Sequence, residues 1–154
     1  MMNSTQADRA IKVTTPLDDD VLLLYRMTAR EELGRLFEFS LELLSHDNAI
    51  ALPDVLGQPM TVSAALPAGG ERFLNGIVSR FSHVGSHGRY ARYRASLVPW
   101  FWCLTRTADC RIFQQQTVPD IIKSIFREHG FTDFDDQLTG TYREWEYCVQ
   151  YRET

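Results

Sequence analysis

Apolar and polar residues alternate along most of the first hundred residues, which is the pattern of strands with one buried face. The clearest example is 35–45, where Phe37, Phe39 and Leu41 share one side and Glu38 and Glu42 share the other. Further strands are expected over residues 9–14, 21–28, 60–66, 72–84 and 89–98. About six strands joined by short turns predict an antiparallel β-barrel or a closed two-layer sheet.

Three local features qualify this pattern. Residues 52–57 are typical of a single helical turn, and Gly76 predicts a bulge or bend inside the long strand 72–84. Gly85 to Gly88 is expected to form the turn of a central hairpin between residues 72–84 and 89–98.

The pattern changes after Pro99, where residues 100–104 form a dense aromatic cluster. A helix is predicted from Val118 to His129, because Thr117 is a natural N-cap, Pro119 suits the first turn and the apolar residues fall on one stripe. Residues 144–153 alternate again and predict a strand. One helix and one or two strands cannot close a core, so we expect the chain to stop inside a second domain.

Composition narrows the class of protein. The chain has 154 residues and a net charge of -4, and it has three cysteines with no CxxC spacing. An acidic balance argues against nucleic acid as the main partner, and unpaired cysteines suit a reducing compartment. Residues 1–8 are polar and unpatterned, so a flexible N-terminus without a signal peptide is expected. The longest aliphatic run, Val21 to Leu24, is too short for a membrane span.

Several groups of residues could carry chemistry, and each has a simpler explanation. His83 and His87 have half the spacing of a zinc site, but nothing in the sequence completes four ligands. The other candidate groups are Cys103, Cys110 and His129, and the aspartates 18–20, 133, 135 and 136. Neither aspartate group has the spacing of a calcium loop. No catalytic, cofactor-binding or metal-ligating residue is predicted, and no cofactor.

Two alternatives to a structural protein remain open at this point. Glu38 and Glu42 flank Ser40 on one strand face, and with Cys103 they would be the residues of a hydrolase. The hairpin also interleaves arginines with aromatic residues, as a single-strand nucleic-acid platform would. The residues are Arg72, Arg80, Arg89, Arg92 and Arg94, with Phe73, Phe81, Tyr90 and Tyr93. Against this platform, Tyr93 points away from the side that Arg92 and Arg94 share.

Several long segments resemble the N-terminal region of VgrG proteins, the trimeric spike proteins of the type VI secretion system. They are GERFLNGIVSRFS (70–82), GRYARYRASLVPWFWCLTRTADCRIFQ (88–114), TVPDIIKSIFREHG (117–130) and YCVQYRET (147–154), with LGRLFEFSLELLS (33–45) before them. The resemblance covers nearly all of the chain from about residue 9.

The resemblance implies a hub of the kind found in contractile phage tails. Residues 9–100 would be a β-barrel related to the tail-tube subunit, and residues 101–154 the truncated start of a second α+β hub domain. The implied partners are two further copies in a homotrimer and a hexameric tube ring, with effectors or adaptors as further candidates. The implied role is structural, without enzymatic activity, nucleic acid or membrane insertion by this segment. The protein would assemble in the bacterial cytoplasm and leave through the secretion apparatus.

Overall fold

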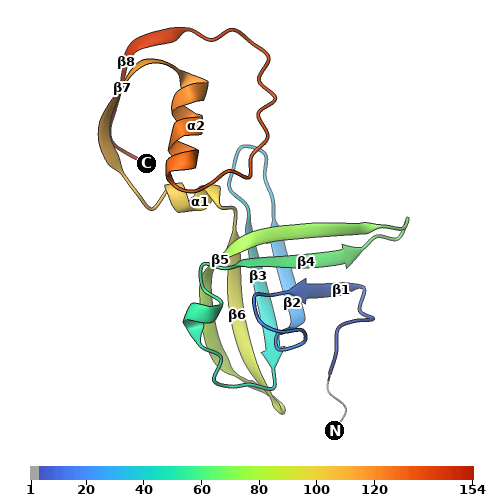
Figure 1. Ribbon diagram of the computed structural model, residues 1–154. Coiled ribbons are helices and arrows are strands. Elements are labelled where there is room, and N and C mark those ends of the chain that lie inside the picture. The colour runs from blue at the N-terminus through green and yellow to red at the C-terminus, as the bar shows by residue number, and fades with distance from the viewer. Residues whose placement is uncertain (1–3) are drawn as a thin grey trace. The chain divides into compact units, whose positions relative to one another are not determined.

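Six antiparallel strands form one strongly curled sheet in the first part of the chain (Figure 1). The strands are β1 (Ile11–Thr14), β2 (Leu23–Arg30), β3 (Glu38–Ser45), β4 (Pro59–Ala65), β5 (Glu71–His87) and β6 (Tyr90–Val98), in the order β1-β4-β5-β6-β3-β2. The structure is a computed structural model that describes residues 4–154. It divides into two compact units, one ending at Trp102 and one beginning at Cys103.

The alternation in the sequence becomes the burial pattern of the first unit. Phe39, Leu41 and Leu43 of β3 are at most 1% exposed, and Leu41 lies opposite Ala95 of β6 in the ladder. Tyr93 is also buried, as predicted, in this core. Each such side chain contributes about 1.5–3 kcal/mol through burial. The mainly β fold class with two α-helices is thus confirmed.

The sheet forms a half-barrel whose edge strands are bridged by a side chain. No ladder joins β1 to β2 within residues 4–154. Instead the buried amide of Gln6 donates to the carbonyl oxygens of Val13 (2.7 Å) and Leu22 (3.3 Å). Its oxygen accepts from the backbone N–H groups of Val13 (3.1 Å) and Leu24 (3.3 Å). One glutamine therefore satisfies backbone groups on both edges.

Ser4 and Gln6, which belong to the N-terminal segment 1–8 that the sequence suggests is flexible, are hydrogen-bonded to the sheet. Besides its buried amide, the backbone N–H of Gln6 donates to Oδ1 of Asp20 (3.0 Å), and Ser4 is hydrogen-bonded to the hydroxyl of Tyr90. The physical reason is that open edges leave polar backbone groups that need partners, which the sequence pattern does not reveal. Residues 1–3 lie outside the described residues.

The central hairpin differs from its prediction in two details. Strand β5 runs through Gly76 without a break, and its ladder with β6 shifts register between Val78 and Arg80 and between His83 and Ser86. Gly76 is needed for another reason, because a Cβ there would lie 2.9 Å from the carbonyl oxygen of Val98.

The predicted turn over residues 85–88 is also misplaced. His87 still pairs with Tyr90 in the ladder, so the turn consists of Gly88 and Arg89 alone. Gly88 has φ 60, and glycine at the first position is favoured in a two-residue hairpin loop. The helical turn predicted near residue 52 is confirmed as a short 3₁₀ segment, Leu52–Asp54.

The second unit pairs two strands and packs a helix on them. Its elements are α1 (Phe101–Leu104, at the division between the units), β7 (Asp109–Thr117), α2 (Val118–Glu128) and β8 (Glu144–Glu153). The predicted helix is confirmed, with Thr117 as N-cap accepting from the N–H of Asp120 (3.3 Å). Strand β7 is not apparent from the sequence, because its run of three glutamines hides the alternation. None of the helices in residues 4–154 has the length and apolar character needed to cross a bilayer.

Candidate protein interface

The outward face of β2, β3 and β6 is polar and carries aligned charges. Arg26 of β2 lies opposite Glu42 of β3, and Glu42 lies opposite Arg94 of β6, so the three form one row across the sheet. The next row contains Thr28 and Ser40. Successive side chains along a strand point to opposite faces of the sheet. The apolar residues that alternate with these polar ones fill the core, so the polar residues face outward.

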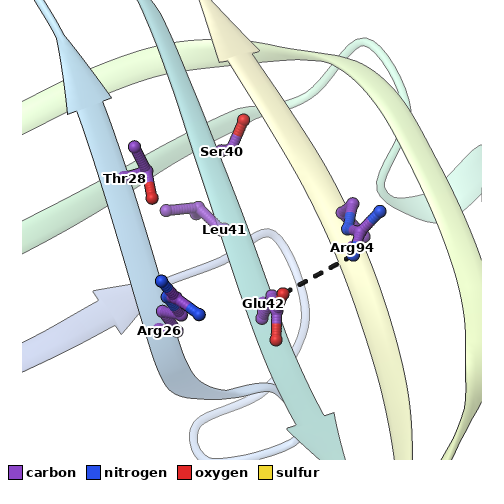
Figure 2. Close-up of a pocket in the computed structure, with 6 residues that line it drawn as sticks. All are labelled: Arg26, Thr28, Ser40, Leu41, Glu42 and Arg94. Atoms are coloured by element: carbon purple, nitrogen blue, oxygen red, sulfur yellow. Dashed lines mark ion pairs between the residues drawn. The ribbon is translucent and has the colours of Figure 1, made fainter.

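A shallow pocket of about 230 Å³ lies in this face (Figure 2). It is lined by Arg26, Thr28, Ser40, Leu41, Glu42 and Arg94. Figure 2 shows Arg26 and Arg94 on either side of Glu42, with an ion pair drawn only between Glu42 and Arg94. In that pair Nη2 of Arg94 is 3.5 Å from Oε1 of Glu42, which is longer than a strong charge-assisted hydrogen bond.

The structure separates the arginines that the sequence grouped into one basic hairpin. Arg72 forms an ion pair with Glu31, and Arg89 bonds to the hydroxyl of Tyr90 in the turn. Ladder positions place Arg80 and Arg92 on the same outward side of the sheet as Arg94. Arg26 joins them, although the sequence alone does not single it out. The only signal for it is its polar place in the alternation of β2.

The aromatic residues of the hairpin do not form a stacking platform. Phe81 and Tyr93 stack on each other inside the core, with ring centroids 5.2 Å apart. The hydroxyl of Tyr90 contacts Ser4 and Arg89, and these hydrogen bonds lower the pKa of Tyr90 below its usual range. Phe73 is 64% exposed, but it lies where β5 pairs with β4, opposite Ser63. Arginines on one side, with Phe81 and Tyr93 in the core, do not provide the interleaved surface that single-stranded nucleic acid requires. The nucleic-acid alternative thus has no support in the geometry.

The histidines and cysteines considered as ligands lie apart. His83 packs against Tyr93 and His87 against Tyr25, with ring centroids 5.1 and 5.2 Å apart. Among the described residues, no three histidine, cysteine, aspartate or glutamate side chains gather in a group that could hold a metal ion. Cys103, Cys110 and Cys148 are free, and His129 ends helix α2.

Three of the six aspartates make local hydrogen bonds through their side chains. Asp20 accepts from Gln6, and bonds from Thr5 and Gln6 keep the pKa of Asp20 below 3.8. In the second unit Asp136 accepts from Lys123 (2.8 Å), which lowers the pKa of Asp136 below the same value. Asp135 accepts from Gln137 (2.7 Å). Glu38 lies opposite Arg30, so the carboxylates proposed for a hydrolase belong to ladder rows of opposite charge.

The second unit exposes the apolar face of its two-stranded sheet. The four aromatic and aliphatic residues that alternate along β8 are 41–66% exposed: Trp145, Tyr147, Val149 and Tyr151. On β7, Ile112 lies opposite Val149 and is 61% exposed. The other face of the sheet holds the buried Phe113, and Arg111 on that face pairs with Glu128 of α2. The helix therefore covers the less apolar side of the sheet.

An apolar groove follows one side of α2. It encloses about 510 Å³, and its apolar lining includes Val118, Ile122, Phe126, Phe134, Leu138 and Tyr142. The predicted apolar stripe of α2 is thus divided, because Ile121 is buried within the unit while Val118 and Ile122 remain about half exposed. Together the groove and the sheet face give the unit two surfaces suited to protein contacts.

A curled antiparallel half-barrel, followed by a unit with uncovered apolar faces, is typical of a protein that forms part of a larger assembly. Residues 30–154 match the phage tail baseplate hub (GPD) family, and the chain belongs to that family. It is a family of structural hub proteins.

Strong sequence similarity links the chain to spike proteins of the type VI secretion system. VgrG1a of Pseudomonas aeruginosa is 58% identical over 149 residues, which are 97% of this chain and 23% of that protein. VgrG1c of the same organism is 54% identical over 97% of this chain and 21% of its own length. The chain therefore spans less than a quarter of these relatives.

A solved structure supports the same fold. The E. coli c3393 protein is described as a component of the type VI secretion system with structural similarity to the bacteriophage T4 tail proteins gp27 and gp5. It superposes with a TM-score of 0.62 at 28% identity, covering 84% of this chain and 40% of that protein. The resemblance to VgrG proteins inferred from the sequence motifs is thereby confirmed.

Proposed function

We propose that this chain is the hub base of a type VI secretion spike. In this proposal three copies of the full-length protein associate, and their half-barrels dock on the hexameric tube ring. Contraction of an outer sheath then drives the spike and its effectors out of the cell. The chain would assemble in the cytoplasm, need no signal peptide and act without catalysis of its own.

The observation that carries the proposal is the outward apolar alternation of β8. Another layer over the four large residues of such a strand would stabilise it, since burial of each contributes about 1.5–3 kcal/mol. Tyr147 and Tyr151 are more than 60% exposed, although they lie on the more apolar face of the sheet. This is expected for a part of a larger assembly and not for a self-sufficient enzyme domain.

The proposal is tested by sedimenting the chain with preassembled tube rings from the same source, once circular dichroism has confirmed folding. Co-sedimentation at physiological salt supports docking by these 154 residues. If the chain remains in the supernatant, the full-length protein is tested in the same way. Binding by the longer protein alone supports docking through the trimer, and absence of binding by both overturns the docking proposal.

Trimerisation is measured separately, by light scattering of the full-length protein during size-exclusion chromatography. A variant with Tyr147→Ser and Tyr151→Ser removes two aromatic side chains from the β8 face, and it should weaken the association if that face packs against another copy and not against the rest of its own chain. Phe73→Ser, which truncates a 64% exposed aromatic residue of the first unit, is the matched control. Equal masses for both variants would contradict a role of the β8 face in assembly.

A further inference from the structure

The cations of the first unit fall into two groups. Six of them have a partner within the unit: Arg9, Lys12, Arg30, Arg35, Arg72 and Arg89. In contrast, Arg26, Arg80 and Arg92 have no side-chain partner among residues 4–154. Arg94 has only the 3.5 Å contact with Glu42. The four poorly paired arginines all lie on the outward face of β2, β3, β6 and β5.

This distribution leaves a basic surface on an acidic protein. The chain carries a net charge of -4, yet Glu42 is the only carboxylate in contact with the four arginines within the described residues. The Nε of Arg92 is buried without a hydrogen-bond partner, and a buried unsatisfied donor is costly. Hydroxyl groups of Thr28 and Ser40, in the row beside the charges, also line the pocket and can donate to an acceptor.

We infer that this surface binds an acidic segment of another protein subunit, with carboxylates that reach Arg26 and Arg94 on either side of Glu42. Guanidinium groups with free N–H donors bind carboxylates through paired hydrogen bonds. The inference rests on the proposed docking function and identifies the chemistry of the partner surface, an acidic segment of the tube-ring subunit.

Eight of the twenty carboxylates of this chain form ion pairs within residues 4–154, so a second copy also has carboxylates to offer. Glu31 and Glu32 pair with arginines of the first unit, and Glu71 pairs with Lys12. In the second unit Glu128 pairs with Arg111, and Asp136 with Lys123. Charge complementarity therefore calls for an acidic partner, and the choice of the tube ring follows from the proposed docking function. Association between copies of this chain that is lost when Arg26 and Arg94 are replaced would overturn that choice.

The test measures affinity for tube rings with the protein that binds them in sedimentation, the chain or its full-length form. In the variant, Arg26→Gln is combined with Arg94→Gln. The matched control combines Lys12→Gln with Arg35→Gln, which removes the same charge from other places. We expect the first pair to lower affinity about tenfold and to reduce its salt dependence, while the control changes affinity less than about twofold. Equal losses in both would overturn the inference.

Glu42→Gln distinguishes a binding role of the pocket from a purely structural role of its residues. It removes the carboxylate that competes for Arg94 and raises the positive potential of the pocket, so affinity for the rings should increase about threefold. Lower or unchanged affinity in a folded Glu42→Gln variant contradicts the inference. Thermal unfolding of each variant shows whether the fold is retained.

A glutamate-rich peptide keeps the inference testable if the rings are not bound at all. Ring binding would then have failed as a function, whereas salt-sensitive binding of the peptide that depends on Arg26 and Arg94 would still support the acidic-segment site. Absence of peptide binding at low salt overturns it. Binding of single-stranded DNA through the same arginines, without peptide or ring binding, also overturns it.

Discussion

Replacing Gln6 by alanine should destabilise the first unit by about 2–4 kcal/mol. The change removes four hydrogen bonds to backbone groups of Val13, Leu22 and Leu24. At about 0.5–1.5 kcal/mol each they give roughly 2–6 kcal/mol. Two of the four are 3.3 Å long and therefore contribute at the weaker end of that range. The lower half of the range is therefore expected.

Urea unfolding followed by circular dichroism measures this loss, and a slope of about 2 kcal/mol/M converts it to a midpoint lower by about 1–2 M. Amide hydrogen exchange adds the local readout. The N–H groups of Val13 and Leu24 lose their acceptor and should exchange faster by a larger factor than that of Ala95, in the middle of the sheet. Gln58→Ala, at an exposed glutamine of the same unit, is the control and should leave the midpoint unchanged.

Gln6→Glu keeps the size of the side chain but removes the N–H donor of the amide. The carboxylate keeps the acceptor but faces the carbonyl oxygens of Val13 and Leu22 without a donor, so it should be at least as harmful as alanine at neutral pH. We expect the pKa of the introduced carboxyl to rise above its ordinary value of about 4.3. The folded state then binds more protons than the unfolded state, so stability falls as the pH rises through the interval between the two pKa values. A Gln6→Ala loss below about 0.5 kcal/mol with unchanged exchange at Val13 would refute the bridging role.

Three further variants test other parts of the fold. Gly76→Ala should lower the unfolding free energy by about 1–3 kcal/mol in urea, because its Cβ would meet the carbonyl of Val98; an unchanged midpoint would contradict that contact. Thr117→Ala should destabilise helix α2 by about 1 kcal/mol, visible as faster exchange of the Asp120 amide, and equal exchange would deny the cap. Because the pKa of Asp136 is lowered in the folded state, its contribution to stability is present above its ordinary pKa and is lost as the pH falls through the lowered value. Lys123→Met should weaken this acid dependence in thermal unfolding, and an identical pH profile would exclude the pair.

The sequence predicted the strands of the first unit because their alternation is coupled directly to burial. Leu41 and Ala95 are fully buried where the pattern placed them. It could not predict how the sheet ends. The two edge strands look like any others in the sequence, and a polar glutamine five residues before β1 looks like part of a tail. Only tertiary contact shows that Gln6 supplies both the donors and the acceptors that the edges lack.

The sequence shows where the arginines are, but it groups them only by how close they are along the chain. Strand pairing regroups them, because Arg26 is remote in sequence from Arg94 and yet lies in the same row. Arg72 is near in sequence and lies at the far end of β5, paired with Glu31. The basic surface thus depends on the pairing register, which decides which residues of neighbouring strands lie side by side. That register cannot be read from the local composition.

Alternation along β8 predicted a strand but could not tell which face is covered. The unit itself buries the side with Phe113 against α2 and leaves Tyr147 and Tyr151 open. Apolar surfaces of this kind are typical of permanent interfaces, whereas the row with Arg26 and Arg94 suits contacts that weaken with salt. If both surfaces serve assembly, high salt should release the partner of the first unit while the association through the second unit persists. A different salt dependence of the two associations would show that the protein uses two kinds of interface. A protein that merely exposes charged and apolar residues would not show it.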